Sequence, residues 1–370
     1  MKAVAIVDGE HYPDVVRWAL AELPYEFVGV VLVGGTEKLR GEPDYGVPIV
    51  EEPGEAEIAI DLSDEPVLDP QRRLELASQF LAAGIPYAGA DFRFDPPEFE
   101  PFELPSIAVI GTGKRVGKTA VTGHVARLLA RRREVVVVAM GRGGPAEPEL
   151  VSTPPTLDDL LALSRSGRHA ASDHLETAAL VGVTTIGCRR AGGGLVGAPS
   201  VSNVREGARL AASLAPDVVV FDGSGAAIPP IATTARILVA HDLTGLNRYR
   251  ALISDIVLRV AEDFTLRLRP TQPLTGRVAV FTTGPAPTED LDADVVHVSR
   301  NLARRDLLRE ELARVEADTY LVELKAAAID VVAEHAFEHG ARLVAAENEV
   351  VAPGLDERVL SLLEREVRAA

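Results

Sequence analysis

The chain has 370 residues, of which 47% are hydrophobic and 25% are charged, and its single cysteine is Cys188. This apolar content is enough for folded cores and excludes a wholly disordered protein, and one cysteine excludes an internal disulfide and a cysteine-based zinc site. The formal net charge of −17 disfavours binding to nucleic acid or to anionic lipid. Any anionic ligand must therefore be held by a local cluster of cations.

We expect no signal peptide in the N-terminal stretch. Asp8 interrupts the first apolar run before it reaches the length of a signal peptide, and no apolar stretch in the chain approaches the length of a membrane-spanning helix. We therefore expect a cytoplasmic protein that interacts with neither nucleic acid nor membrane.

The first part of the chain, residues 1–95, alternates apolar runs with amphipathic stretches. We expect strands at 3–7, 28–33, 57–60 and 85–89, and helices at 13–22 and 71–83. Strands that alternate with helices predict a parallel α/β sheet, here of a Rossmann-like kind. The proline-rich and acidic segment 91–105 has no periodicity, which indicates a linker.

The remainder of the chain repeats this alternation in two further parts. In residues 106–268 we expect a helix at 120–131 and strands at 107–110, 134–139, 181–186, 217–221 and 237–240. A proline-containing connector is expected at 269–276. In residues 277–370 we expect strands at 278–281, 295–298, 319–322 and 343–345, and helices at 304–316, 324–339 and 355–370. The whole chain is thus expected to be an α/β protein.

The strongest motif is the loop Gly111–Thr119, GTGKRVGKT, which follows an apolar strand and opens a helix. Backbone N–H groups in such a loop, together with the positive end of the helix dipole, bind phosphate. Lys118 would reach the β- and γ-phosphates of ATP, and the Thr119 hydroxyl would ligate Mg²⁺. The residues expected to bind ATP are Thr112, Gly113, Lys114, Arg115, Val116, Gly117, Lys118, Thr119 and Ala120. The motif predicts a central P-loop NTPase-type parallel-sheet domain, flanked by the N-terminal α/β domain and a smaller C-terminal α/β region.

The loop departs from the strict G-x-x-x-x-G-K-[ST] pattern, because Thr112 stands where the pattern has glycine. In this it resembles the loops of dethiobiotin synthetase and of the cobyrinate amidating synthetases, whose fold carries Mg²⁺ carboxylates at neighbouring strand ends. The strand at 217–221 is followed by DGSG, so we expect Asp222 to hold Mg²⁺ directly or through water, the alternative being an ordinary turn. Lys114 and Arg115 either neutralise the transferring phosphoryl group or are solvated loop residues.

Two further glycine-rich loops carry arginine and follow strands, namely GRGG at 141–144 and GCRRAGGG at 187–194. Guanidinium groups bind phosphate and carboxylate bidentately, and glycine lets backbone N–H groups approach closely. Ligands of open parallel sheets lie at the carboxyl ends of strands, so both loops should converge with the P-loop and DGSG on one crevice. The alternative for each arginine is a surface ion pair. The residues expected to bind a small anionic substrate are Arg142, Gly143, Arg189, Arg190, Gly192, Gly193, Gly194 and Ser224.

Longer segments resemble the cyclic 2,3-diphosphoglycerate synthetase family over nearly the whole chain. They include residues 6–13 (IVDGEHYP), 33–39, 111–121, 137–149, 169–204 and 320–332, and IGCRRAGGG is the most specific of these motifs. The resemblance implies a ligase that uses ATP to phosphorylate one phosphate of 2,3-bisphosphoglycerate. The neighbouring phosphate then expels orthophosphate and closes a cyclic pyrophosphate. The catalytic residues expected are Lys118, Lys114, Arg189 and Arg190, and a homodimer is expected.

Two other functions stay open at this point. A related kinase or ligase acting on another small polyanion would keep the P-loop and Asp222 but reassign the arginines. A nucleotide-dependent regulatory switch would turn over no small molecule.

A few residues allow more than one interpretation. His11 and Lys38 lie at ligand-side strand ends of the first domain and belong to an anion pocket, to an interdomain contact, or to turn and helix-start chemistry. His241 either lies near the nucleotide or is structural. Cys188 is a small buried residue rather than a nucleophile, because no histidine partner is apparent. Only the family resemblance selects Asp173, His174, Ser202 and Asn203.

Overall fold

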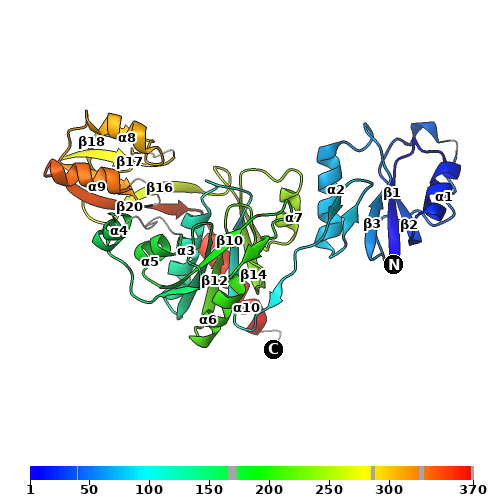
Figure 1. Cartoon of the computed structure of the whole chain (residues 1–370), viewed down its shortest axis with the longest axis horizontal. Helices are drawn as coiled ribbons and strands as arrows, with labels where there is room; N and C mark the ends of the chain where they lie inside the picture. The colour runs from blue at the N-terminus through cyan, green and yellow to red at the C-terminus, as the bar shows by residue number, and fades with distance from the viewer. Residues whose placement is uncertain (40, 166–172, 285–287, 325–328, 368–370) are drawn as a thin grey trace. The chain divides into compact units, whose positions relative to one another are not determined.

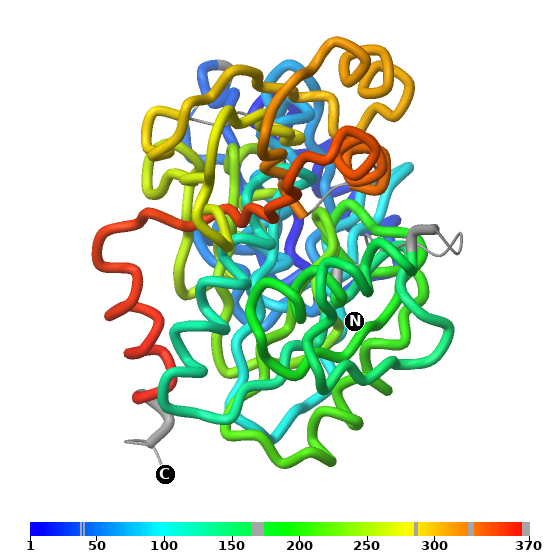
Figure 2. Tube along the Cα trace, turned by 90° about the vertical axis from the view of Figure 1, so that its left-hand side faces the viewer, coloured from blue at the N-terminus to red at the C-terminus, as the bar shows by residue number. Residues whose placement is uncertain are grey.

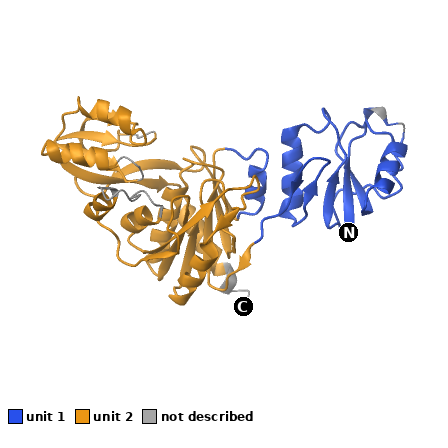
Figure 3. Ribbon diagram, in the orientation of Figure 1, with its two compact units in different colours: residues 1–98, 242–254 blue, residues 99–241, 255–370 orange. Residues whose placement is uncertain are grey.

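The computed structural model in Figure 1 describes residues 1–39, 41–165, 173–284, 288–324 and 329–367. The chain forms two compact units (Figure 3). The first unit contains residues 1–98 and 242–254, and the second contains residues 99–241 and 255–370. The helix predicted at 324–339 falls partly outside the described residues, at 325–328, as does the start of the segment 169–204.

The first unit is built on one five-stranded sheet in the order β2-β1-β3-β4-β5. Its strands are β1 (Lys2–Val7), β2 (Glu26–Leu32), β3 (Ile58–Asp61), β4 (Tyr87–Ala88) and β5 (Arg93–Phe94). The first four are parallel, and β5 pairs antiparallel with β4 inside the segment predicted as a linker. The helical segments are α1 (Pro13–Glu22), the short η1 (Thr36–Lys38), α2 (Pro70–Ala82) and α7 (Asn247–Leu252).

Helix α7 comes from the middle of the chain and packs against α2. The hydroxyl group of Ser78 on α2 donates a hydrogen bond to the carbonyl oxygen of Gly245 at 3.1 Å. The segment 242–254 follows β14 (Ala235–Ala240) of the second unit, and nothing in its local sequence pattern indicates that it packs with the first unit.

The second unit contains the main sheet, in the order β11-β10-β8-β12-β7-β14-β15. Its strands are β7 (Ser106–Gly111), β8 (Val135–Gly141), β10 (Thr184–Ala191), β11 (Val201–Ser202), β12 (Val218–Asp222), β14 (Ala235–Ala240) and β15 (Ile256–Arg259). All strands in this order except β11 run parallel to one another, namely β10, β8, β12, β7, β14 and β15. This is the P-loop NTPase-type sheet expected from the sequence. The short β9 (Glu149–Val151) pairs antiparallel with β10, and β6 (Glu100–Pro101) pairs with β13 (Ile231–Ala232).

Helices cover both faces of this sheet. They are α3 (Lys118–Ala130), α5 (Asp173–Val181) and α6 (Val204–Ser213), whereas α4 (Leu157–Arg165) packs against α9 (Ile329–Glu338) of the C-terminal part. On β10, an added Cβ at Gly187 would meet the ring of His174 on α5, and the thiol of Cys188 lies against Gly207 on α6. Successive strand residues point to opposite faces, so α5 and α6 lie on opposite sides of the sheet. Helix α3 contacts α5 and shares its face.

The C-terminal part forms a second sheet within the same unit, in the order β16-β20-β19-β17-β18. Its strands are β16 (Thr265–Pro270), β17 (Arg277–Phe281), β18 (Asp294–Ser299), β19 (Thr319–Glu323) and β20 (Arg342–Val351), with helices α8 (Arg305–Leu312), α9 (Ile329–Glu338) and α10 (Leu355–Val367). The connector predicted at 269–276 begins as part of β16, because those residues pair antiparallel with β20.

The last helix returns to the main sheet (Figure 2). Leu355, Val359 and Leu362 of α10 belong to the same apolar core as Ile107 of β7 and Val125 of α3. The C-terminal part therefore completes the core of the P-loop domain in addition to forming its own sheet. A buried carboxylate also joins the C-terminal sheet to α3. Glu347 of β20 is 4% exposed, and its two oxygens form ion pairs with Arg127 of α3 and Arg269 of β16.

We expect Glu347→Gln to lower the free energy of unfolding by about 2 kcal/mol, as measured by urea denaturation followed by circular dichroism. Breaking a fully buried ion pair costs about 3–5 kcal/mol, and the partly exposed arginines recover some hydration. The matched control is Glu349→Gln, two residues along β20, whose carboxylate is less buried than that of Glu347 and pairs with Arg267. That change should cost less than about 1 kcal/mol, and equal losses in the two variants would contradict the role assigned to Glu347.

Candidate functional site

The loop 111–119 leaves the fully buried strand β7 and enters α3. Arg115 and Gly117 have φ values of 63° and 86°, a conformation that turns successive backbone N–H groups toward one point. Beneath the loop, Val116 is 2% exposed and packs into the main core. Lys114 and Arg115 are exposed. The loop is therefore anchored by an apolar side chain and presents its polar groups outward.

Thr112 has a structural role at the position where the strict motif carries glycine. Its backbone N–H donates to the carbonyl oxygen of Val239 at 3.1 Å, and its Oγ1 accepts from the backbone N–H of His241 at 3.4 Å. Both partners lie at the end of β14, the strand beside β7. The threonine thus ties the start of the P-loop to the neighbouring strand.

A buried ion pair lies at the base of the loop. Lys118 is 8% exposed and Asp222 is fully buried, and the Nζ of Lys118 contacts Asp222 Oδ1. The hydroxyl group of Thr122 donates to the same oxygen at 2.7 Å. The other oxygen, Oδ2, is buried and has no hydrogen-bond partner in the described part of the chain.

A buried carboxylate oxygen without a donor is uncommon and fits a site for a cation. The Thr119 hydroxyl lines the adjoining cavity, so the oxygen donors of Thr119 and Asp222 form a set that suits Mg²⁺. Thr122 was not singled out from the sequence. It lies one helical turn after Lys118, and that spacing is the signal that could have identified it.

Four loops that the sequence predicts to bind ligands follow strands that are consecutive in the sheet, β10, β8, β12 and β7. Because these strands are parallel, GCRRAGGG, GRGG, DGSG and the P-loop all lie at the same edge. The register pairs Arg189 with Gly141. An added Cβ at Gly144 would lie 2.1 Å from the carbonyl oxygen of Cys188, so this close approach of two loops requires glycine.

Side chains connect these loops to one another. The guanidinium group of Arg190 donates to the carbonyl oxygen of Ser224 at 2.8 Å and to that of Gly192 at 2.5 Å. Asn203 Oδ1 accepts from the backbone N–H of Arg189 at 2.7 Å, and its Nδ2 donates to the carbonyl of Ala146 at 3.1 Å. Arg190 therefore joins GCRRAGGG to DGSG, and Asn203 joins it to the loop after β8.

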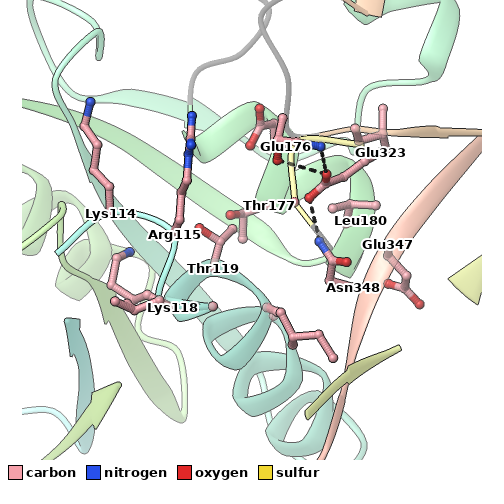
Figure 4. A pocket seen from close by; sticks show the side chains of 18 of the residues that line it. Lys114, Arg115, Lys118, Thr119, Glu176, Thr177, Leu180, Glu323, Glu347 and Asn348 are labelled. Carbon is pink, nitrogen blue, oxygen red and sulfur yellow. Dashed lines mark hydrogen bonds between the residues drawn. The ribbon is translucent and has the colours of Figure 1, made fainter. Parts of the chain in front are cut away.

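A cavity of about 650 Å³ opens beside the P-loop in the second unit (Figure 4), a volume typical of small-molecule sites. The predicted site residues that line it are Gly113, Lys114, Arg115, Val116, Gly117, Lys118, Thr119, Ala120, Arg142 and Ser224. The predicted residues outside its lining are Thr112, Gly143, Arg189, Arg190, Gly192, Gly193, Gly194 and Asp222. The arginine loop after β10 thus reaches the cavity through its contact with Ser224.

Other lining residues were not predicted from the sequence. They are Arg127, Glu176, Thr177, Thr282, Thr283, Gly284, Glu323, Glu347 and Asn348, with several apolar neighbours. Most come from α5 and from the C-terminal sheet, where no local motif indicates a ligand. Figure 4 shows Lys114, Arg115 and Lys118 on one side of the cavity, and Glu323, Glu347 and Asn348 on the other. The cavity is therefore cationic at the P-loop and rich in carboxylates at the C-terminal sheet.

In the first unit, the strand order reverses between β1 and β3, where open α/β sheets bind ligands. Asp8, fully buried, occupies this position and accepts backbone N–H groups of Glu10 at 2.9 Å and of Asp64 at 2.7 Å. Burial by itself would raise the pKa of Asp8, but the hydrogen bonds from Asp64 and His11 outweigh it and hold that pKa below its usual value. This geometry favours the interpretation of His11 as turn chemistry. The side chain of Lys38 lies outside the described residues.

Two further residues named from the sequence are buried. Cys188 is 1% exposed, and burial raises the pKa of its thiol to about 12, which leaves little nucleophilic thiolate. His174 is 4% exposed, and its Nε2 lies 3.8 Å from the carboxylate of Glu149. The side chain of its neighbour Asp173 is outside the described residues. Burial lowers the pKa of His174, so the ring stays neutral in the folded protein near pH 7.

Sequence models of three domains match the chain, each described by the name cyclic 2,3-diphosphoglycerate synthetase. The N-terminal domain matches residues 2–95, the P-loop domain residues 106–266 and the C-terminal domain residues 276–349. Curated proteins with the same name are similar along their whole length. The one from Rubrobacter xylanophilus is 44% identical and covers 98% of this chain and 97% of its own. The one from Pyrococcus furiosus is 39% identical, with 98% of each chain covered.

The alignment with the Rubrobacter protein extends over 428 positions, more than the 370 residues of this chain, so that relative contains additional internal segments. A crystal structure of the apo form of LpxK from Aquifex aeolicus in complex with ATP covers 80% of this chain and 95% of its own, at 14% identity and a TM-score of 0.45. So distant a likeness carries no argument about activity. In the described part of the chain, no helix has both the length and the apolar character needed to cross a membrane.

The buried His174 predicts a pH dependence of stability. Because its pKa is lowered in the folded protein, the unfolded chain takes up a proton below about pH 6.5 that the folded protein resists. The protonation of His174 therefore has no effect on stability above about pH 7, and it lowers the free energy of unfolding as the pH drops toward about 5.5. We expect His174→Gln to lose less stability over this range than the wild type, as measured by urea unfolding at pH 7.5 and 5.5. Exposed His241→Gln is the control, and parallel losses in wild type and His174→Gln would refute the assignment.

Proposed function

The chain belongs to the cyclic 2,3-diphosphoglycerate synthetase family, and on that premise we propose that it is an ATP-dependent ligase. It closes 2,3-bisphosphoglycerate into cyclic 2,3-diphosphoglycerate and releases ADP and orthophosphate. The observation that carries the proposal is the buried Lys118–Asp222 pair at the base of the P-loop, beside three glycine-rich loops at adjacent strand ends. A homodimeric assembly and a cytoplasmic location stay predictions from the sequence.

ATP binds through the backbone N–H groups of residues 112–120 and the positive end of α3. Lys118 turns from Asp222 toward the β- and γ-phosphates, and its departure leaves both carboxylate oxygens of Asp222 for a cation. Mg²⁺ held by Thr119 and Asp222 would neutralise charge on the phosphates. The ion pair of the ligand-free protein thus keeps Lys118 and Asp222 in place for this exchange.

The reaction has two steps. An oxygen of one substrate phosphate attacks the γ-phosphorus of ATP, the bond to the β-phosphate oxygen breaks, and ADP leaves. An oxygen of the neighbouring phosphate then attacks the inner phosphorus of the new anhydride, orthophosphate leaves, and the P–O–P ring is closed. Both nucleophiles are already anions, so no general base is needed. This agrees with the absence of histidine among the described residues that line the cavity.

Charge neutralisation is the main requirement, since 2,3-bisphosphoglycerate carries a charge of about −5 at pH 7. Two of its phosphates must approach each other and then approach ATP, which needs several fixed cations. Lys114, Arg115 and Arg142 line the cavity and can supply them. We assign Arg189 and Arg190 to the same substrate. The backbone of Gly143 and of Gly192–Gly194 offers additional donors, and Arg190 also holds the loop that carries Ser224.

We expect ³¹P NMR of the protein with Mg-ATP and 2,3-bisphosphoglycerate to show a new pyrophosphate-type resonance, with ADP and orthophosphate in equal amounts. In Lys118→Ala the rate should fall by at least about 100-fold, because a cation at the developing charge is lost. Lys2→Ala, a change at a partly exposed lysine outside the cavity lining, is the control. Thr119→Val serves as a second variant if loss of Lys118 unfolds the protein. If ADP is released only with a different polyanion, that polyanion and not 2,3-bisphosphoglycerate is the substrate. If no acid causes ADP release, the proposal of a ligase is wrong.

We expect the arginine loops to affect the binding of the acceptor substrate and not the binding of ATP. Arg142→Ala should raise the KM for 2,3-bisphosphoglycerate by about tenfold or more and leave the KM for ATP nearly unchanged, because a charge-assisted contact is lost only to the acceptor. Steady-state kinetics with each substrate varied in turn measures this. Arg132→Ala, an exposed change outside the cavity lining, is the matched control. An equal rise in both KM values would reassign Arg142 to the nucleotide.

A further inference from the structure

The side of the cavity formed by the C-terminal sheet carries a hydrogen-bond network centred on Glu323 (Figure 4). Glu323 ends β19 and is 5% exposed. Its Oε2 accepts from the hydroxyl group of Thr282 at 2.8 Å, and from both the backbone N–H and the hydroxyl group of Thr283 at 2.8 and 3.0 Å. Its Oε1 accepts from Asn348 Nδ2 at 2.6 Å. The carboxylate thus connects the ends of β17 and β19 with β20.

This network fixes which groups are left for a ligand. An ionised carboxylate only accepts hydrogen bonds, so every group that contacts Glu323 uses a donor there. The amide of Asn348 is held with its NH₂ toward Glu323, which leaves Oδ1 as an acceptor. The hydroxyl group of Thr283 likewise points its hydrogen at Glu323 and keeps its lone pairs. The network therefore offers acceptors to the cavity.

The opposite side of the cavity has the reverse character. Lys114, Arg115 and Lys118 are donors that carry positive charge. Glu347, on the same side as Glu323, is already paired with Arg127 and Arg269. The cavity thus has a donor end at the P-loop and an acceptor end at the C-terminal sheet, and a ligand that spans it must be an anion at one end and a neutral donor at the other.

The two ligands of the proposed function differ in this respect. In 2,3-bisphosphoglycerate both hydroxyl groups are esterified, so its phosphate and carboxylate oxygens are almost entirely acceptors near pH 7. The nucleoside of ATP carries the ribose hydroxyl groups and the exocyclic amino group of adenine, which are neutral donors. Apolar side chains of Leu180, Leu266 and Leu324 line the same cavity and suit a flat base.

We propose that the acceptor end formed by Glu323, Thr283 and Asn348 binds the nucleoside of ATP and determines nucleotide selectivity. The proposal rests on the proposed function, in which ATP occupies the cavity. Asn348 contacts a ribose hydroxyl group or the adenine amino group through Oδ1. Glu323 is a positioning residue, because it orients the Asn348 amide. The triphosphate points from this end toward Lys118, and 2,3-bisphosphoglycerate binds on the side of the arginine loops.

Calorimetric titration of the full chain with ADP, 2′-deoxy-ADP, 3′-deoxy-ADP and IDP tests the selectivity without any acceptor substrate. The wild type should bind at least one analogue about five- to tenfold more weakly than ADP, the usual effect of one lost hydrogen bond. Weaker binding of a deoxy analogue identifies a contact with that ribose hydroxyl group, and weaker binding of IDP identifies a contact with the adenine amino group. Equal affinity for all four nucleotides overturns the proposal even if every variant fails to fold.

Asn348→Ala should weaken the binding of ADP by the same factor and abolish the discrimination among nucleotides seen in the wild type. The affinity for inorganic triphosphate should stay unchanged. Glu323→Gln should also reduce the discrimination, because the new amide can donate to Asn348 Oδ1 and lets that side chain rotate. The matched controls are Asn301→Ala and Glu311→Gln. Glu311 accepts from Asn301 at 3.1 Å and from Ser299 at 2.6 Å in a similar network outside the cavity lining.

Several outcomes separate this inference from the proposed function. The inference is wrong if Asn348→Ala discriminates among the nucleotides as strongly as the wild type does. It is also wrong if that variant binds 2,3-bisphosphoglycerate more weakly but binds ADP with unchanged affinity. Selective ADP binding that Asn348→Ala abolishes, in a protein that forms no cyclic product, supports the nucleoside site and refutes the ligase. No binding of any of the nucleotides refutes both.

Discussion

The buried ion pair between Lys118 and Asp222 is the contact around which the second unit is organised. It joins the first turn of α3 to the end of β12, with both side chains almost completely removed from water. Transferring either charge into the interior costs several kcal/mol unless a partner is present, so each residue stabilises the other in place. The pairing leaves Oδ2 of Asp222 without a hydrogen-bond partner in the described part of the chain, and the exchange that we propose on ATP binding starts from this oxygen.

The C-terminal segment completes the core of the P-loop domain and forms the rest of the cavity lining. Helix α10 contributes to the core beneath α3, and Glu347 pairs with arginines of α3 and β16. These contacts hold the ends of β17 and β19 opposite the P-loop, so the cavity is formed by segments more than a hundred residues apart in the chain. The same arrangement places Lys114, Arg115 and Lys118 on one side of the cavity and Glu323 and Asn348 on the other, and our proposal that ATP spans the cavity rests on this difference.

The loops with the clearest motifs have different physical tasks. The P-loop presents backbone N–H groups because Val116 anchors it from below and Thr112 ties it to β14. In GCRRAGGG, the side chain of Arg190 donates to the carbonyl oxygen of Gly192 in its own loop and to that of Ser224 in DGSG, whereas Arg189 is exposed. Of the two arginines that look like one anion site in the sequence, Arg190 thus also has a structural contact, whereas Arg189 is exposed to solvent.

Local pattern was sufficient to predict the α/β class, the parallel strands that carry the P-loop and Asp222, and the family. These features depend on residues close in sequence: apolar runs, a glycine-rich turn at a helix start, and a carboxylate directly after a strand. The strand character of Thr265–Pro270, the packing of α7 in the first unit, and the cavity residues Glu323, Glu347 and Asn348 were not predictable in this way. Each depends on a partner brought close only by folding, such as β20 for β16, α2 for α7, and two arginines for Glu347. The sequence by itself determined which chemistry the P-loop edge carries, because that chemistry is encoded in contiguous residues. Only the tertiary structure decided what faces it, because the energy of a buried charge or hydrogen bond depends on neighbours in space.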